Sequence, residues 1–289
     1  MSLRSPTAGP PAARAATTGP RLVVRGLTVR FGGLTAVEDV DLDVAGGEVV
    51  ALIGPNGAGK TTVFNAVCGL VRPARGTVTF EGRPLGPTAR LAGRGVARTL
   101  QGLGLFPGLS VRENVAVGVP GGAVDADARA DAQLADLGLA ARASLPVGSL
   151  PYAQRAAVAL ARALVARPRL LLLDEPAGGL GPEDIAGLAD VVRRVAAAGT
   201  GVLLVEHHVD FVMGVSDRVV VLDFGHVIAT GAPEDVRRDP RVEEAYLGIP
   251  ADAAASAGHD GRAPGGTGHE GRAPGGTGHD GRAPGGGAR

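Results

Sequence analysis

A glycine-rich segment between an apolar run and a helical pattern constrains the fold of this chain more than any other feature. Glu48–Ile53 is an almost continuous apolar run, typical of a strand in a sheet covered on both faces. The next residues, Gly54-Pro55-Asn56-Gly57-Ala58-Gly59-Lys60-Thr61, fit the pattern GxxxxGK(S/T), and a helical pattern follows from about Thr61. Lys60 is the single lysine among 29 basic residues. A strand, this loop and a helix in succession predict a site for the phosphates of a nucleotide.

The chemistry of this loop follows from its residue types. Glycines let the backbone fold closely around phosphate oxygens, and N–H groups at a helix N-terminus supply partial positive charge. Lys60 can reach the β- and γ-phosphates, and the hydroxyl of Thr61 can bind Mg²⁺. The alternative, a glycine-rich turn with a chance lysine, leaves the flanking strand and helix unexplained. We expect the loop to bind the nucleotide through Gly54, Asn56, Gly57, Ala58, Gly59, Lys60, Thr61 and Thr62.

Two carboxylates follow a second apolar run. Leu170–Leu173 reads as a buried strand, and Asp174 and Glu175 come directly after it. Open α/β sheets bind their ligands at the carboxyl ends of the strands, so this pair is expected near the phosphate loop. Asp174 would then support Mg²⁺, and Glu175 would orient or polarise the attacking water. A polar exit from a strand without any chemistry is the alternative, which the intact phosphate loop disfavours.

The alternation of patterns predicts an α/β fold. Strand patterns recur along the chain. In its second half they alternate with helical patterns such as Tyr152–Leu164 and Pro182–Ala198. Together they predict a parallel sheet with an inserted helical part at about 98–164. The expected strands are Arg21–Arg30, Val37–Val44, Glu48–Ile53, Gly76–Phe80, Arg169–Asp174, Gly201–Glu206 and Arg218–Asp223.

Segments at both ends of the chain differ in composition from the rest. Residues 1–20 are rich in Ala, Pro, Ser and Thr, and we interpret them as a disordered leader. Residues 251–289 contain no Val, Ile, Leu or Phe and repeat a ten-residue unit, GHDGRAPGGT in its first copy. Such a segment has little to bury, so we expect a disordered Gly/Ala/Pro-rich tail. The globular domain is expected at 21–250.

Composition excludes several classes of protein. The 289 residues carry 29 basic and 29 acidic side chains, which argues against a general nucleic-acid-binding protein. A single cysteine, Cys68, cannot form an intramolecular disulfide. The longest apolar runs fall far below the roughly 18 residues of a spanning helix, and the first twenty residues lack a signal-peptide core. We therefore do not expect the chain to cross a membrane itself.

Several spaced motifs across about 21–249 resemble those of the ATPase subunits of ABC transporters. Phe31 in RFGGL matches the aromatic residue that stacks on adenine in this family, and Gln101 in ARTLQ matches the glutamine loop. His207 in LLVEHH matches the switch histidine that contacts the γ-phosphate, and Gly225 lies in the turn of the hairpin that follows. The resemblance implies a P-loop NTPase (RecA-like) core with an N-terminal antiparallel β part and an inserted α-helical subdomain. It also implies ATP and Mg²⁺ as cofactors, Glu175, His207 and Gln101 as catalytic residues, and Thr61, Gln101 and Asp174 at the metal.

Three segments narrow the resemblance to the ATPases of importers for branched-chain amino acids and related amides. These are RFGGLTAVEDVDLDV, GLGLFPGLSVRENV and DPRVEEAYLG. The resemblance implies transmembrane permease subunits, a second ATPase subunit and, indirectly, a substrate-binding protein as partners, and no nucleic acid. It implies a cytoplasmic location at the inner face of the membrane. Leu103–Val115 would pass motion to the permease, and LGLFPGL offers apolar side chains for that contact.

The chain departs from the family in its signature loop. Where the family has LSGGQ, or LSYGQ in the importer branch, this chain has Leu150-Pro151-Tyr152-Ala153-Gln154. Pro151 removes both the serine hydroxyl and one N–H that would face the γ-phosphate bound by the opposite subunit. Proline is nonetheless compatible with the first turn of a helix. Glycine also replaces a usual Asp or Asn in the stretch Gly179-Leu180-Gly181-Pro182.

These departures fall on contacts made to the opposite subunit. They favour a heterodimer in which a different ATPase subunit supplies an intact signature loop. One alternative is an ATP-binding regulatory or partly degenerate subunit, which the intact Glu175 argues against. Another is an ABC-type ATPase of DNA repair or translation, which would usually bring a long inserted arm or two fused halves. A P-loop kinase would leave Gln101 and His207 without a role.

Overall fold

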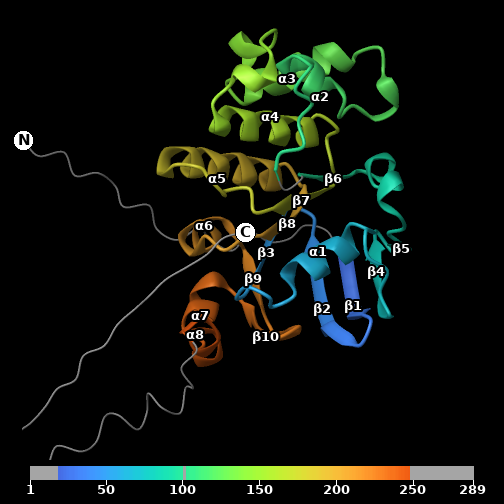
Figure 1. Ribbon diagram of the computed structural model, residues 1–289, viewed down its shortest axis with the longest axis vertical. Helices are drawn as coiled ribbons and strands as arrows, with labels where there is room; N and C mark the ends of the chain where they lie inside the picture. Colours follow the sequence, from blue (N-terminus) through green and yellow to red (C-terminus); the bar gives the residue numbers. More distant parts are fainter. Residues whose placement is uncertain (1–18, 100–101, 248–289) are drawn as a thin grey trace, which may run out of the picture. The chain divides into compact units, whose positions relative to one another are not determined.

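The computed structural model of the chain describes residues 19–99 and 102–247. These residues form two β-sheets, helices on both faces of the larger sheet, and a separate group of helices beside it (Figure 1). The predicted tail at 251–289 and most of the predicted leader lie outside the described residues. The first strand begins at Pro20, the last residue of the predicted leader.

The larger sheet is mainly parallel, as the alternation of strand and helix patterns predicts. Its strands lie in the order β10-β9-β3-β8-β7-β6, and all neighbours are parallel except β9 and β10, which form an antiparallel hairpin. Strands β3, β7, β8 and β9 are buried almost throughout because both faces of the larger sheet are covered. The bounds are β3 Val49–Ile53, β6 Val96–Arg98, β7 Leu170–Asp174, β8 Gly201–Val205, β9 Arg218–Asp223 and β10 His226–Gly231.

Alternate residues of these strands belong to two different cores. Val50, Leu52 and Leu172 pack in one core with α1 and the smaller sheet. Ala51 and Leu173 pack in the other with α4 to α8. This period of two is the reason that a continuous apolar run is needed in a central strand. The helices are α1 Lys60–Val67, α5 Pro182–Ala197, α6 Val209–Val215, α7 Pro233–Arg237 and α8 Pro240–Leu247.

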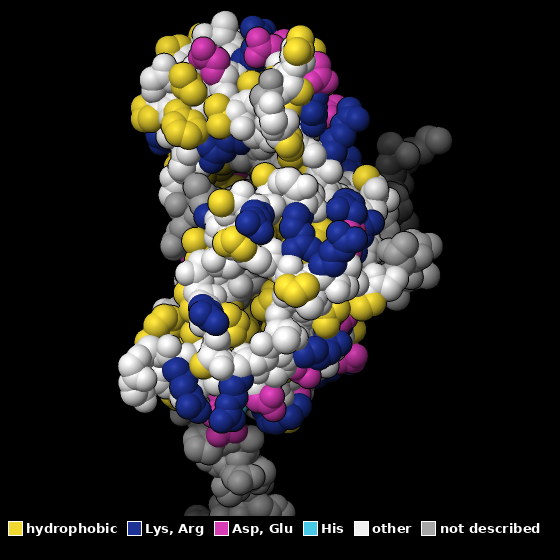
Figure 2. Space-filling view, turned by 90° about the vertical axis from the view of Figure 1, so that its right-hand side faces the viewer, with side chains coloured by type: hydrophobic (Ala, Val, Ile, Leu, Met, Phe, Trp, Pro, Cys, Tyr) yellow, Lys and Arg dark blue, Asp and Glu magenta, His cyan; other side chains and the backbone are white. Residues whose placement is uncertain are grey.

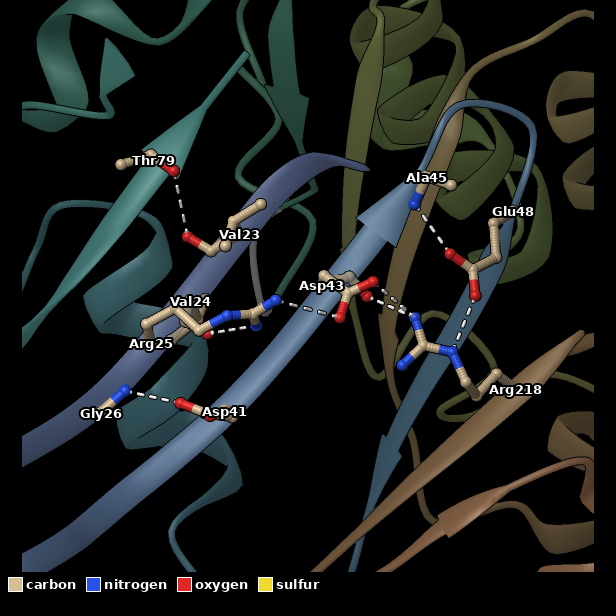
Figure 3. A network of polar contacts seen from close by, with 10 residues as sticks. All are labelled: Val23, Val24, Arg25, Gly26, Asp41, Asp43, Ala45, Glu48, Thr79 and Arg218. Atoms are coloured by element: carbon tan, nitrogen blue, oxygen red, sulfur yellow. Dashed lines mark hydrogen bonds and ion pairs between the residues drawn. The ribbon is translucent and has the colours of Figure 1, made fainter. Parts of the chain in front are cut away.

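The smaller sheet is the predicted N-terminal antiparallel part. Its strands lie in the order β2-β1-β4-β5, with β1 at Pro20–Phe31, β2 at Leu34–Ala45, β4 at Arg75–Phe80 and β5 at Arg83–Pro84. A polar network joins it to the larger sheet (Figure 3). Arg218 donates from Nε to Glu48 at 2.8 Å and from Nη2 to the carbonyl oxygen of Asp43 at 2.7 Å, while Glu48 accepts from the backbone N–H of Ala45 at 2.7 Å. This network ties the amino ends of β3 and β9 to β2.

Arginine side chains gather near the middle of the face that carries β4, β5 and β6 (Figure 2). Among the ion pairs of the described residues, Arg169 lies 2.5 Å and Arg21 lies 4.0 Å from the carboxylate of Glu81, which follows β4. Arg94 donates to the carbonyl oxygens of Leu85 and Phe80. These contacts tie the two sheets together at a second place.

The inserted helical part has its own core. It contains α2 Val111–Ala116, α3 Ala126–Asp136 and α4 Tyr152–Leu164, packed through a cluster that includes Val115, Leu134 and Val158. It follows β6, whose last residue, Arg98, pairs with Leu172 in the larger sheet. Short 3₁₀ turns connect the elements at Thr88–Arg90, Ala92–Arg94, Pro120–Gly122, Ala140–Arg142 and Val147–Ser149. Within residues 19–99 and 102–247, no helix is long and apolar enough to cross a bilayer.

Candidate nucleotide-binding site

The phosphate loop joins β3 to α1 at the carboxyl edge of the larger sheet. Gly54 has φ +149° and Gly59, the N-cap residue of α1, has φ +103°. A Cβ at Gly54 would collide with the carbonyl oxygen of Leu222, and one at Gly59 would lie 2.9 Å from that of Ala36. Both positions therefore need glycine for space as well as for conformation. The helix N-terminus behind the loop directs its free N–H groups toward the place of an anion.

Lys60 is the first residue of α1 and its side chain folds back over the loop. Its Nζ donates to the carbonyl oxygens of Gly54 at 2.7 Å and Pro55 at 2.8 Å. Burial lowers the pKa of Lys60 from its ordinary value, and the nearby charge of Glu175 opposes that shift. The predicted lysine is thus positioned on the loop and within electrostatic reach of the predicted acidic pair.

The remaining predicted loop residues are accessible to a ligand to different degrees. Asn56, Gly57 and Thr61 are exposed, and Thr62 is half-buried. Ala58 is buried because its carbonyl oxygen accepts from Gly225 in the turn between β9 and β10. The β9–β10 hairpin, which the family resemblance predicts, therefore supports the phosphate loop through this hydrogen bond.

The acidic pair lies at the carboxyl end of β7, as predicted. Burial raises the pKa of the Asp174 carboxyl, and the adjacent Glu175 adds to the rise. Glu175 has φ +46°, an unusual left-handed backbone for a residue other than glycine. Its Oε1 lies 3.8 Å from Nδ1 of His207, which follows β8. The structure thus brings together Lys60, the acidic pair and His207 from three neighbouring strands.

Phe31 is the last residue of β1 and half-exposed, at the turn where β1 pairs with β2 through Leu34. Ala36, two residues beyond Leu34, lies against Gly59 of the phosphate loop. The aromatic ring is therefore carried by the hairpin that touches the loop, and it is free to stack on a ligand. Gln101 lies outside the described residues, so the structure does not test its predicted role.

A magnesium ion would fit the residues that the structure brings together. Magnesium usually takes one or two carboxylates together with substrate phosphates and water. Asp174 and the exposed hydroxyl of Thr61 are such a donor set. Within the described part of the chain, no group of three or more His, Cys, Asp or Glu side chains could hold a metal without a ligand's help.

The signature stretch Leu150–Gln154, which differs from the family sequence, lies at the start of α4. Pro151 is the N-cap residue, with φ −55° and ψ 157°, and the helix begins directly after it at Tyr152. Tyr152 is exposed and lies against Gly179, in the loop that follows Glu175. Proline is therefore compatible with the helix, as expected, and Pro151 leaves the helix without a side-chain cap.

Sequence reasoning missed three residues that support the site. Glu206 is fully buried behind His207. Burial raises the pKa of the Tyr246 phenol in α8, and the nearby backbone of Gly54 in the phosphate loop opposes that rise. Asn114, also fully buried, accepts from Phe106 N–H and donates to the carbonyl oxygens of Phe106, Leu109 and Ser110, which fixes the loop before α2. Asn114 follows the polar residues Arg112 and Glu113 in VRENVAVGV, so the sequence gives no signal that distinguishes it as buried, whereas Glu206 directly follows the apolar run of β8 and could have been noticed there.

Comparison with known families gives two matches. The family described as "ABC transporter" matches residues 37–178, and the family described as "Branched-chain amino acid ATP-binding cassette transporter" matches residues 226–252. The first match contains the phosphate loop and the acidic pair, and the second contains α7, α8 and Tyr246.

Similar proteins cover the whole described domain. The high-affinity branched-chain amino acid transport ATP-binding protein LivG of Salmonella typhimurium is 40% identical over an alignment of 250 residues that covers 79% of this chain and 98% of that protein. BraF of Pseudomonas aeruginosa, of the same description, is 38% identical with the same coverage. The lipopolysaccharide export system ATP-binding protein LptB of Acidithiobacillus ferridurans is 37% identical over 73% of this chain and 90% of its own length.

Solved structures agree in fold. A nucleotide-free ATP-binding cassette from an ABC transporter superposes with a TM-score of 0.72 at 28% identity, covering 80% of this chain and all of that one. The cbiO1 protein from Clostridium perfringens, part of the transporter complex cbiONQ, gives a TM-score of 0.70 at 26% identity over 82% of this chain and 99% of its own. With a phosphate loop, an acidic pair and a histidine at one sheet edge, and relatives matched over nearly their full length, this chain belongs to the ABC transporter family as an ATP-binding, ATP-hydrolysing subunit.

Proposed function

We propose that this subunit hydrolyses Mg-ATP at the carboxyl edge of the larger sheet and thereby powers the import of branched-chain amino acids or related amides. The observation that carries the catalytic part is the meeting of Lys60, Asp174, Glu175 and His207 at that edge. The cargo part is supported by the family match at residues 226–252 and by the printed descriptions of LivG and BraF. The residues of this chain do not touch the cargo.

Each residue has a proposed role in hydrolysis. Phe31 stacks on the adenine, and the loop N–H groups and Lys60 bind the phosphates. Glu175 accepts a proton from the attacking water, or orients it, and His207 donates to the γ-phosphate. Magnesium, held by Thr61, Asp174 and Gln101, neutralises phosphate charge when bound. Closure of two ATPase subunits over the site excludes water and strengthens these contacts.

The proposed partners are supported by the printed descriptions of the relatives as transport ATP-binding proteins. Permease subunits are the membrane partners, so the chain is peripheral on the cytoplasmic face, and a substrate-binding protein takes part indirectly. The loop before α2 is the proposed permease contact because Phe106 is half-exposed there while Arg162 donates to the carbonyl oxygens of Leu103 and Gly104 at 2.8 and 2.7 Å. A rigid loop with an exposed aromatic side chain is suited to transmit motion.

The second ATPase subunit is proposed to be a different chain. Pro151 offers neither a hydroxyl nor an N–H to a nucleotide bound by the opposite subunit. A partner with an intact signature loop would complete the site on this chain, whereas the reciprocal site would be weak. The alternative, a partly degenerate subunit that binds ATP without useful turnover, is supported by the same substitution and opposed by the intact acidic pair.

ATP hydrolysis by the purified chain tests the catalytic proposal. The full chain, its Glu175→Gln variant and its Pro151→Ser/Ala153→Gly variant are compared with Mg-ATP. We expect slow hydrolysis by the chain alone, faster hydrolysis by the double variant, and none above background by Glu175→Gln. Brisk hydrolysis by the chain alone, unchanged by the double substitution, would contradict the need for a different partner.

Transport tests the cargo. The chain is reconstituted in vesicles with its permease subunits, a second ATPase subunit and a substrate-binding protein. We expect ATP-dependent uptake of radiolabelled leucine, isoleucine or valine that stops with Glu175→Gln. ATP-dependent transport of other solutes without any uptake of these amino acids would contradict the cargo and leave the ATPase proposal intact.

A further inference from the structure

The carboxylate of Glu206 is shielded from solvent and lies next to the catalytic residues at the carboxyl edge of the larger sheet. It follows the last residue of β8, Val205, and its side chain is 0% exposed. A buried carboxylate is costly unless hydrogen bonds compensate for its lost hydration. Among the described residues, no Lys or Arg side chain lies within 4.0 Å of the Glu206 carboxylate, and the nearest side-chain nitrogen in an ion-pair position is Nδ1 of His207, 3.8 Å from Oε2. Its stabilisation therefore has to come mainly from the backbone.

The two oxygens of Glu206 hold two different segments. Oε1 accepts the N–H of Ala177, in the loop that follows Glu175, at 2.8 Å. Oε2 accepts the N–H groups of His207 at 2.8 Å and His208 at 3.2 Å. One side chain thus joins the segment that carries the proposed base to the segment that carries the histidine facing it. Hydrogen bonds to an ionised carboxylate are stronger than those between neutral groups.

The segment held by Oε1 has a backbone that needs support. Glu175 has φ +46°, and residues other than glycine keep such a conformation only where their surroundings enforce it. The N–H of Glu175 donates to Val205 at 2.8 Å, and its carbonyl oxygen accepts from Gly178 at 3.1 Å. The bond from Ala177 to Glu206 lies between these two and fixes the loop against β8. Two of these hydrogen bonds involve Glu175 itself, the residue that would activate water, and the third holds the loop two residues beyond it.

We propose that Glu206 is a positioning residue for ATP hydrolysis, which holds Glu175 and His207 in their mutual geometry by accepting hydrogen bonds from both segments. This inference rests on the proposed roles of Glu175 and His207. Glu206 does not touch the nucleotide. Its loss is therefore expected to lower turnover while nucleotide binding by the phosphate loop continues.

The test replaces an acceptor by a donor without a change of size. In Glu206→Gln one oxygen becomes an NH₂ group, which faces at least one backbone N–H that it cannot accept. Glu206→Asp keeps both acceptors on a shorter side chain and gives a second, milder variant. Glu48→Gln is the matched control because Glu48 is a mostly buried carboxylate that also accepts from a backbone N–H, but at the amino ends of the strands (Figure 3).

Four quantities are measured on the folded full chain, alone and in the Pro151→Ser/Ala153→Gly background: kcat, KM for ATP, amide hydrogen exchange and the melting temperature. For Glu206→Gln we expect kcat to fall at least about 10-fold while KM for ATP stays within about twofold, the pattern of an interaction needed in the transition state. Glu206→Asp should lie between Gln and the parent. Hydrogen exchange should accelerate at the amides of Ala177, His207 and His208. Glu48→Gln should lower the melting temperature and keep kcat.

The outcomes separate this inference from the proposed function. If folded Glu206→Gln keeps kcat within about twofold of the parent, or if Glu48→Gln lowers kcat as much as Glu206→Gln does, Glu206 has a structural role only and the inference is wrong. If Glu206→Gln does not fold, Glu206→Asp decides by the same criterion. If neither parent hydrolyses ATP faster than its Glu175→Gln form, the proposed hydrolytic function itself fails.

Discussion

Pro151 is the N-cap residue of α4, and Gln154, the third residue of that helix, has a buried Oε1 atom without a hydrogen-bond partner among the described residues. The two facts have one explanation. In a capping box, a glutamine at the third position accepts the N–H of the N-cap residue, whose hydroxyl accepts from the third N–H in return. Proline has neither group. The substitution that alters the signature loop therefore also leaves the start of α4 uncapped.

Pro151→Ser is expected to stabilise the folded chain by about 1 kcal/mol. A serine cap contributes about 1 kcal/mol and satisfies the orphaned acceptor, and the loss of proline's rigidity in the unfolded chain takes back part of the gain. Thermal unfolding should show a melting temperature higher by about 3 °C for a domain of this size. Pro151→Ala restores the N–H without the hydroxyl, so its gain should be smaller. A lower melting temperature for Pro151→Ser would show that the capping geometry is absent.

Gly179→Ala is expected to destabilise the contact between the signature stretch and the loop after Glu175. Gly179 has φ +76°, and a Cβ there would lie 3.1 Å from Cε1 of Tyr152. The left-handed backbone alone costs a residue with a Cβ about 1–2 kcal/mol. Gly187→Ala is the matched control, since Gly187 lies in α5 with open space around it and should gain about 0.5–1 kcal/mol. Opposite shifts in denaturant midpoint are therefore expected, and equal shifts would contradict the strain argument.

The central strands and the phosphate loop could be predicted from the sequence because their signals are local. A strand that is covered on both faces must be apolar throughout, so β3, β7, β8 and β9 were each evident as a run of Val, Leu and Ile. The Gly-rich loop has few alternatives once a strand and a helix flank it. The meeting of Asp174 with this loop could be inferred because carboxyl ends of parallel strands share one edge.

The rest depends on contacts between residues distant in the chain. The three residues of β6 carry no period of their own and form a strand only because β7 lies beside them. Glu206 accepts from Ala177, which lies 29 residues away in the chain, and Tyr246 lies close to the backbone of Gly54, which is far away in the chain. A sequence pattern reports neither distance nor orientation, so these supporting residues remained hidden.

Asp174→Asn is expected to raise stability while it removes hydrolysis. Burial, and then the charge of Glu175, raise the pKa of Asp174 in the folded chain above its unfolded value. A group shifted in this direction adds stability at low pH that is lost as pH rises through the folded pKa, so at neutral pH its ionisation opposes folding. The neutral amide avoids that cost. The melting temperature in the absence of nucleotide should rise at pH 7, and Mg-dependent kcat should fall at least about 10-fold.

The same comparison at acidic pH supplies the control for Asp174. As pH falls, the parent carboxyl becomes protonated in the folded chain at a higher pH than in the unfolded chain, because its folded pKa is raised, so the difference in melting temperature between Asp174→Asn and the parent should shrink. A variant less stable than the parent at pH 7 would mean that Asp174 makes a stabilising contact which outweighs its burial.

Cys68 is expected to be inert in the folded chain. Its side chain is 0% exposed, and burial raises the pKa of the thiol from 9.0 to about 11. The thiolate, the reactive form, is therefore scarce at pH 8, where labelling with a thiol reagent should be at least about 100-fold slower than in denaturant. Because the folded pKa lies above the unfolded one, the thiol favours folding fully below pH 9, and this contribution is lost as pH rises through 11. Rapid labelling of the native chain would mean that the helix after the phosphate loop opens frequently.

Phe106→Ala is expected to separate hydrolysis from transport. The ring is 47% exposed, while its backbone is fixed by Asn114 and its face lies 5.9 Å from the Arg162 guanidinium. Because the side chain is remote from the acidic pair in the chain and contributes nothing to the phosphate loop, the isolated chain should hydrolyse ATP within about twofold of the parent rate. In the assembled transporter the stimulation of ATP hydrolysis by cargo should fall by at least about 10-fold, since a half-exposed aromatic residue on a rigid loop is a typical interface anchor.

Leu70→Ala, which truncates another exposed apolar side chain beyond the end of α1, is the matched control and should keep that stimulation. If both variants retain coupling, the permease binds elsewhere on the domain, and if Phe106→Ala also lowers the basal rate, the loop acts on the catalytic edge directly.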